Sequence, residues 1–95
     1  MIKYKYEYTI CSQPDEEIFR RQCEALEKSI PGLIKGDFLQ DVDGSVLQFY
    51  QLRGNQIRVS NDMELGGVFL DSNISIARYF SPPKARRAMD VALRQ

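Results

Sequence analysis

Two periodicities follow one another in the first third of the chain, and together they limit the folds open to it. Residues 2–10 alternate without a break between apolar and polar side chains. The apolar members of this alternation are Ile2, Tyr4, Tyr6, Tyr8 and Ile10. A period of two built from aromatic and β-branched residues is typical of a half-buried strand. The next apolar residues recur at helical spacing, so the sequence predicts a helix packed against a sheet.

Signals at both ends delimit this helix. Ser12 and Asp15 are spaced as a capping box, and two glutamates follow where the positive end of the helix dipole favours acidic side chains. The pair Pro31 and Gly32 predicts the end of the helix. Its buried stripe should consist of Phe19, Cys23, Leu26 and Ile30.

Tight-turn signals predict a β-meander in the middle of the chain. Asp43 and Gly44 are typical of a two-residue type I′ hairpin between residues 33–42 and 45–53. Gly54 and Asn55 suit a second tight turn before residues 56–60. If both loops have two residues, Phe38 faces Phe49 and Tyr50 faces Val59. One sheet face then carries Leu39, Tyr50, Leu52, Ile57 and Val59.

The last third of the chain adds strands and a helix. Residues 65–70 predict a strand with a bulge or a close backbone approach at Gly66 and Gly67. Residues 73–80 alternate as a strand does, which we favour over a short helix capped near Ser72. Residues 81–83, Ser-Pro-Pro, predict the start of a final basic helix.

The expected fold is therefore α+β, with elements in the order β-α-β-β-β-β(-β)-α. A curved antiparallel sheet with both helices on one face would hide each apolar stripe. Residues 1–95 form one domain of ordinary size. The element order resembles the unit of TATA-binding-protein-like folds, and a resemblance of this kind implies a fold without a function.

Composition argues against several classes of chemistry. The chain has no histidine, which removes the commonest general base, and Cys11 and Cys23 lack metal-ligand or redox-pair spacing. We expect two free thiols, buried or half-buried, with no metal, no cofactor and no catalysis. The aspartates around Asp43 lack the Gly and Glu of a calcium loop, so a solvated turn is favoured over a site for a cation or basic partner.

Charge and hydropathy suggest a cytoplasmic protein without a membrane segment. Thirteen basic and thirteen acidic residues balance, yet residues 1–47 hold six basic and nine acidic side chains. The second half carries the opposite excess, including a basic last helix that is expected to be mainly a solvated face. No apolar run approaches the length of about 20 residues that spans a bilayer.

The best candidate site is the second sheet face, because helices on one side cannot cover both. The predicted site residues are Phe38, Leu47, Phe49, Gln51 and Arg58, with Asp41 and Asp43 at the edge. Exposed aromatics with an arginine are typical of protein interfaces, although RNA-binding sheets share them and packing under a loop or a dimer partner is a third account. The stripe of tyrosines is expected in the core more than in base or sugar stacking.

The leading hypothesis is a non-catalytic protein-binding module, such as a bacterial immunity protein, antitoxin or inhibitor that blocks a partner protein. The alternative is a nucleic-acid-binding module that uses the aromatic face and the basic last helix. A small-ligand or enzyme subunit that uses Asp and Tyr side chains ranks third. A homodimer is compatible with all three.

Overall fold

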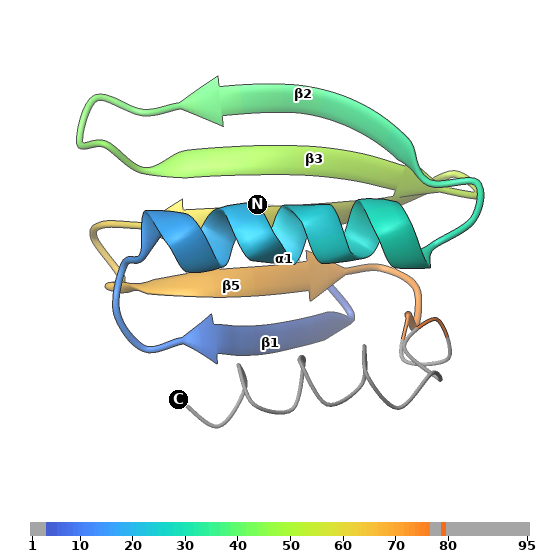
Figure 1. Cartoon of the computed structure of the whole chain (residues 1–95), viewed down its shortest axis with the longest axis horizontal. Coiled ribbons are helices and arrows are strands. Elements are labelled where there is room, and N and C mark those ends of the chain that lie inside the picture. The colour runs from blue at the N-terminus through green and yellow to red at the C-terminus, as the bar shows by residue number, and fades with distance from the viewer. Residues whose placement is uncertain (1–3, 77–78, 80–95) are drawn as a thin grey trace.

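A five-stranded antiparallel sheet with one helix across a face makes up the described part of the chain, residues 4–76 and Tyr79, in a computed structural model (Figure 1). The elements are β1 (Tyr6–Cys11), α1 (Glu16–Ser29), β2 (Ile34–Gln40), β3 (Val46–Leu52), β4 (Asn55–Asp62) and β5 (Gly67–Ser72). The strand order is β1-β5-β4-β3-β2. The chain thus starts at one edge, crosses the sheet through α1 and returns by consecutive hairpins.

Helix α1 begins later than its sequence signals suggest. Asp15 is the N-cap and its side chain accepts from the backbone N–H of Ile18, so the predicted capping role of Ser12 is wrong. The reason is that Asn61 of β4 accepts the backbone N–H of Asp15 at 3.0 Å, which ties the helix start to the sheet. The helix ends as predicted, with Ile30 as C-cap and Gly32 at a φ of 78° just beyond it.

The core lies between α1 and the sheet face beneath it, which we call the helix face. The predicted helical stripe, from Phe19 to Ile30, is buried as expected. Its partners on the sheet are the fully buried side chains of Tyr50, Leu52, Ile57, Val59, Val68 and Leu70. Both cysteines are free and buried, as predicted.

The β2–β3 hairpin differs from its prediction, and the difference changes which face each β2 residue occupies. Asp41 N–H donates to Ser45 O and Gly44 N–H to Asp41 O, which gives a three-residue loop with Gly44 at a φ of 93°. The register is therefore shifted by one residue, and Phe38 pairs with Gln48 rather than Phe49. Because side chains alternate, Phe38 lies on the helix face and Leu39 on the far face, the reverse of the prediction.

The register of the β3–β4 hairpin also differs from its prediction, but every side chain stays on the predicted sheet face. Its turn is formed by Arg53 and Gly54, both at positive φ, instead of Gly54 and Asn55. Tyr50 pairs with Ile57 rather than with Val59. A shift of two residues preserves the face, so the predicted buried set on β3 and β4 is correct.

Gly67 is a point of close backbone approach, as predicted for this glycine pair. A Cβ at Gly67 would lie 2.7 Å from the carbonyl oxygen of Cys11 and 2.8 Å from the ring of Phe69. The pairing of β1 with β5 shifts between Thr9 and Cys11, so the bulge lies in β1, opposite Val68 and Phe69, next to this glycine.

Downstream of β5, the predicted strand over residues 73–80 is wrong for its described part. Ser72 binds the backbone of Ile74 through its hydroxyl, and this local turn ends the strand. Ile76 is buried nonetheless. The described residues therefore contain one helix, and the expected last helix lies outside them, as do its basic side chains. None of the described helical structure is long and apolar enough to cross a membrane.

The predicted tyrosine stripe is divided between the two faces. Tyr8 packs against the core, whereas Tyr6 is 38% exposed. Tyr4 is buried on the far face, where its hydroxyl donates to Gln56 and its ring lies 4.8 Å from the guanidinium carbon of Arg58. The alternation breaks at Lys5, where the backbone bends before β1 begins.

Candidate functional site

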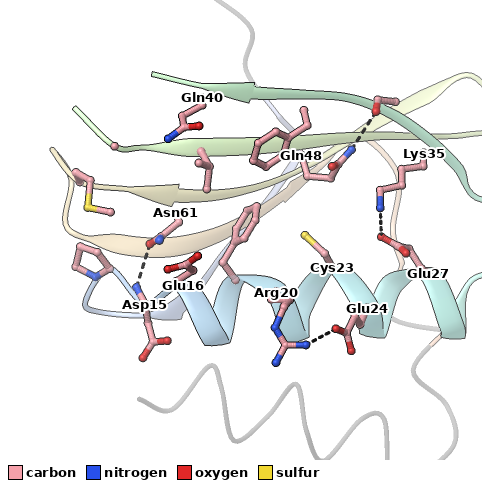
Figure 2. Close-up of a pocket in the computed structure, with 17 residues that line it drawn as sticks. Asp15, Glu16, Arg20, Cys23, Glu24, Glu27, Lys35, Gln40, Gln48 and Asn61 are labelled. Atoms are coloured by element: carbon pink, nitrogen blue, oxygen red, sulfur yellow. Dashed lines mark hydrogen bonds and ion pairs between the residues drawn. The ribbon is translucent and has the colours of Figure 1, made fainter. Parts of the chain in front are cut away.

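A groove of about 830 Å³ separates α1 from the β2–β3 hairpin (Figure 2). We call it the α1–β2 groove. Phe19 and Cys23 of the helix form one apolar side of it, and Phe38 and Val46 of the hairpin form the other. Phe38 is 54% exposed, because β2 lies at the edge of the sheet and nothing in the described part of the chain covers it.

A one-residue bulge in β2 and a buried glutamine fix the position of Phe38. The pairing of β2 with β3 shifts between Lys35 and Phe38. Gln48 Nε2 lies 3.1 Å from the carbonyl oxygen of Gly36 and 3.2 Å from that of Asp37, which the bulge displaces from regular pairing. Gln48 is buried on the helix face, so it supports the strand from beneath.

One end of the groove is closed by a polar network. Lys35 Nζ lies 3.3 Å from Glu27 Oε2, which also accepts the Tyr50 hydroxyl at 2.6 Å. The hydrogen bond from Tyr50 lowers the pKa of the Glu27 carboxyl, while burial and the same contact raise the pKa of Tyr50. Burial also raises the pKa of the Cys23 thiol. Tyr50 and Cys23 therefore stay protonated, and the carboxylate stays ionised and paired.

Carboxylates gather at the other, open end of the groove. Asp15 and Glu16 begin α1 there, and the β2–β3 turn brings Asp41 and Asp43 to the same end of the molecule (Figure 1). The backbone N–H of Ser45 donates to Asp43 and lowers the pKa of its carboxyl. Asp41 likewise accepts from the N–H of Val42.

These acids differ from those at the closed end because no described cation pairs with them. Arg20 is shared between Glu17 and Glu24, and Lys35 is held by Glu27. Within residues 4–76, no three carboxylates or thiols converge closely enough to hold a metal ion. The open end therefore presents spread, unpaired negative charge rather than an ion-binding cage.

The predicted site is divided by the observed register. Leu47, Phe49, Gln51 and Arg58 lie on the far face, as predicted, while Phe38 lies on the helix face. Asp41 and Asp43 lie at the hairpin tip, adjacent in the chain to Gln40 and Gly44, which line the groove. The structure thus does not bring Phe38 and Phe49 together.

Arg58 is engaged within the fold rather than free on the far face. Its Nε and Nη2 lie 3.2 and 2.8 Å from Asp71 Oδ2. The side chain of Asp71 is only 7% exposed, and Tyr4 stacks on the guanidinium. These contacts give Arg58 a structural role on the far face.

The α1 wall of the groove was not identified from the sequence, although a signal for it was present. Glu16, Arg20, Glu24 and Glu27 recur three or four residues apart beside the apolar stripe. Such spacing places them on one flank of the helix. Only the tertiary structure shows that β2, rather than solvent, faces this flank.

Comparison with known proteins finds no relative. No family model matches the chain, and no curated protein or solved structure matches it. The functional argument therefore depends on the geometry and chemistry of these residues alone.

Proposed function

We propose that this chain is a non-catalytic protein-binding module that covers a site on a partner protein, in the manner of a small bacterial immunity protein, antitoxin or inhibitor. The observation that supports this proposal is the exposure of β2 along its whole length. On this edge strand, Ile34 and Leu39 are 62% and 51% exposed on the far face, and Phe38 is 54% exposed on the helix face. Large exposed apolar side chains that share a surface, as Ile34 and Leu39 do, are typical of interaction sites.

Strand β2 also has features that limit nonspecific pairing with other strands. The unpaired backbone groups of an edge strand can pair with strands of other molecules unless charges or bulges limit that pairing. Lys35, Asp37 and the bulge at Gly36 interrupt β2 in this way. The remaining apolar positions then favour a specific partner over self-aggregation.

The chemistry of the groove supports binding rather than catalysis. The thiol in the groove, Cys23, has a raised pKa, and a protonated thiol is a poor nucleophile. Tyr50 is protonated for the same reason and donates to Glu27. The chain has no histidine to act as a general base.

The nucleic-acid alternative receives less support from the charges. Among the described residues, twelve are acidic and seven are basic. On the far face Arg58 is paired with Asp71, and Glu7 and Asp62 lie nearby. A nucleic-acid surface needs unpaired cations to displace counterions from phosphates.

The test uses the partner that co-purifies with the tagged chain from its native host. Replacing Ile34 and Leu39 together by serine should weaken binding of that partner by at least about thirtyfold, since interface anchors typically contribute about 2 kcal/mol or more. Affinity is measured by isothermal titration calorimetry with the identified partner. Tyr6→Ser, on the opposite edge strand, is the matched control and should bind as the wild type does.

Two results would contradict this proposal. One is unchanged affinity in a folded Ile34→Ser, Leu39→Ser variant. The other is a co-purified species that proves to be nucleic acid, with affinity that falls steeply as salt increases.

A further inference from the structure

We propose that the α1–β2 groove binds an extended, basic segment of the partner, with apolar side chains over Phe38 and cationic side chains at the open end. This inference rests on the proposed protein-binding function and specifies the chemistry of the partner. It depends on two independent features of the groove, its apolar middle and its uneven charge (Figure 2).

The middle of the groove can hold apolar side chains from both walls. Phe38 and Val46 line it from the hairpin, and Phe19 and the protonated thiol of Cys23 line it from α1. The three-residue β2–β3 loop sets the register that places Phe38 on the helix face, and the buried Gln48 binds the bulged backbone next to it. An apolar side chain of a bound segment would remove exposed surface of Phe38 from water.

Charge decides which end of the segment is basic. At the closed end, Glu27 is already paired with Lys35, and along the wall Arg20 pairs with Glu24. At the open end, Glu16 lines the groove with no ion pair, and the hairpin-tip aspartates flank it. Lysine or arginine side chains are the complementary groups for that end.

An extended segment suits this shape because the groove follows β2. Lys35, Gly36, Phe38 and Gln40 all contribute to its lining, so the groove accompanies the strand along most of its length. A strand-like segment places every second side chain toward the groove. Apolar residues at the groove-facing positions over Phe38, and basic residues at the groove-facing positions nearest the open end, would therefore satisfy both features.

The test measures binding of three dye-labelled ten-residue peptides by fluorescence anisotropy at physiological salt. In the valine–lysine peptide, every second residue is a serine, and the positions between are valines except at one end, where they are lysines. The valine–glutamate peptide has glutamate in place of lysine, and the serine–lysine peptide has serine in place of valine. We expect the valine–lysine peptide to bind and each of the others to bind at least about tenfold more weakly, because each lacks one of the two complementary features. Equal binding of the valine–glutamate peptide would overturn the inference, as would the absence of valine–lysine binding.

Matched variants locate the binding to the groove. Phe38→Ser should reduce affinity for the valine–lysine peptide at least about tenfold, while Tyr6→Ser, at an exposed aromatic position on the opposite edge strand, should not. Thermal unfolding confirms that both variants are folded. Unchanged binding by folded Phe38→Ser would overturn the inference.

Charge variants provide a second, independent readout. A triple variant of Glu16→Gln, Asp41→Asn and Asp43→Asn keeps side-chain oxygens that can accept the backbone N–H groups of the turn but removes three of the four open-end charges, and should weaken peptide binding at least about tenfold. Of two single variants with the same change of net charge, Glu16→Gln should also weaken binding, and Glu7→Gln, on β1 at the opposite edge of the sheet, is the control. Because exposed charges are screened beyond about 8 Å at physiological salt, the control should bind nearly as the wild type does. Equal losses in both single variants would overturn the inference.

Failure of this inference is distinguishable from failure of the proposed function. If no peptide binds but the partner still requires Ile34 and Leu39, the groove inference fails and the protein-binding proposal stands. If the partner binds every β2 variant with the affinity of the wild type, both proposals fail. If light scattering shows a dimer that Phe38→Ser dissociates, the occupant is a second copy of the chain and the inference is wrong.

Discussion

Gln48 is the residue on which the candidate site most depends. Its side chain binds the carbonyl oxygens of the β2 bulge from the helix face. It also pairs with Phe38 across the hairpin, so the bulge and the groove share one support. A buried glutamine in a core position is therefore explained by the local geometry of the neighbouring strand.

Replacing this glutamine should destabilise the hairpin. Gln48→Leu keeps the size of the side chain but leaves the carbonyl oxygens of Gly36 and Asp37 without their side-chain donor, which should lower the free energy of unfolding by about 1 to 3 kcal/mol. Urea unfolding followed by circular dichroism measures the change. The control is Gln51→Leu, an exposed position on the same strand. Equal stability of Gln48→Leu and wild type would show that these contacts do not hold the bulge.

At the scale of elements, α1 and β2 are tied together by one carboxylate. Glu27 accepts from Tyr50 of β3 and lies beside Lys35 of β2. The pKa of this carboxyl is lowered first by the hydrogen bond from Tyr50 and then by Lys35. A lowered pKa in the folded state means that the ionised form stabilises the fold.

This contact predicts a pH-dependent difference between wild type and Glu27→Gln. Stability from a group with a lowered pKa is present above its unfolded pKa, about 4.3 for glutamate, and is lost as pH falls through the folded value. The wild type should therefore be more stable than Glu27→Gln at pH 7, and the gap should close below about pH 4. Thermal midpoints measured across this range test the prediction. Glu16→Gln is the control, and a constant gap across pH would contradict the assignment.

The helix and the central strands form the interior that the rest of the structure depends on. Leu26 of α1 and Ile57 of β4 are both fully buried. Leu26→Asp or Ile57→Asp should each lower the free energy of unfolding by at least about 3 kcal/mol, because a buried charge would have no partner. Leu65→Asp, at a position 74% exposed, should change it by no more than about 0.5 kcal/mol. An unchanged thermal midpoint in either core variant would show that the core is assigned wrongly.

At the scale of the whole molecule, unpaired charges of opposite sign lie at opposite ends of the sheet. The start of α1, the β2–β3 turn and the β4–β5 turn share one end, with Glu16, Asp43 and Glu64 among their acids (Figure 1). Lys28, at the end of α1, and Arg53, in the β3–β4 turn, lie at the other end. The topology produces this separation because consecutive antiparallel strands alternate in direction.

The separation of charge has a kinetic consequence for binding. A basic partner should associate faster with the acidic end than uncharged surfaces would allow, and the association rate should fall as salt increases. The apolar middle of the groove would then determine how long the complex lasts, since anchor residues act mainly on dissociation. Stopped-flow association of the valine–lysine peptide at several salt concentrations would separate the two effects. A rate constant for association that does not change with salt would contradict this account.

Sequence periodicity alone determined the helix, its buried stripe, and the buried face of β3 and β4. These predictions are confirmed for two reasons. The buried stripe of a helix follows from its own spacing and not from the strands it pairs with. The register of the β3–β4 hairpin differs from its prediction by two residues, which leaves every side chain on its predicted face. The antiparallel α+β class followed from the same signals. The bounds of the elements were less accurate, since Asn61 helps to set where α1 begins.

Only the tertiary structure decided where Phe38 lies and that a groove exists. Asp43 and Gly44 suit both a two-residue and a three-residue loop, and the extra residue turns β2 over relative to its prediction. The groove joins α1 to β2, and its opening depends on the position of the hairpin relative to the helix. Local sequence carries no such information, because the decisive contacts, from Asn61 to Asp15 and from Lys35 to Glu27, join elements that meet only after folding.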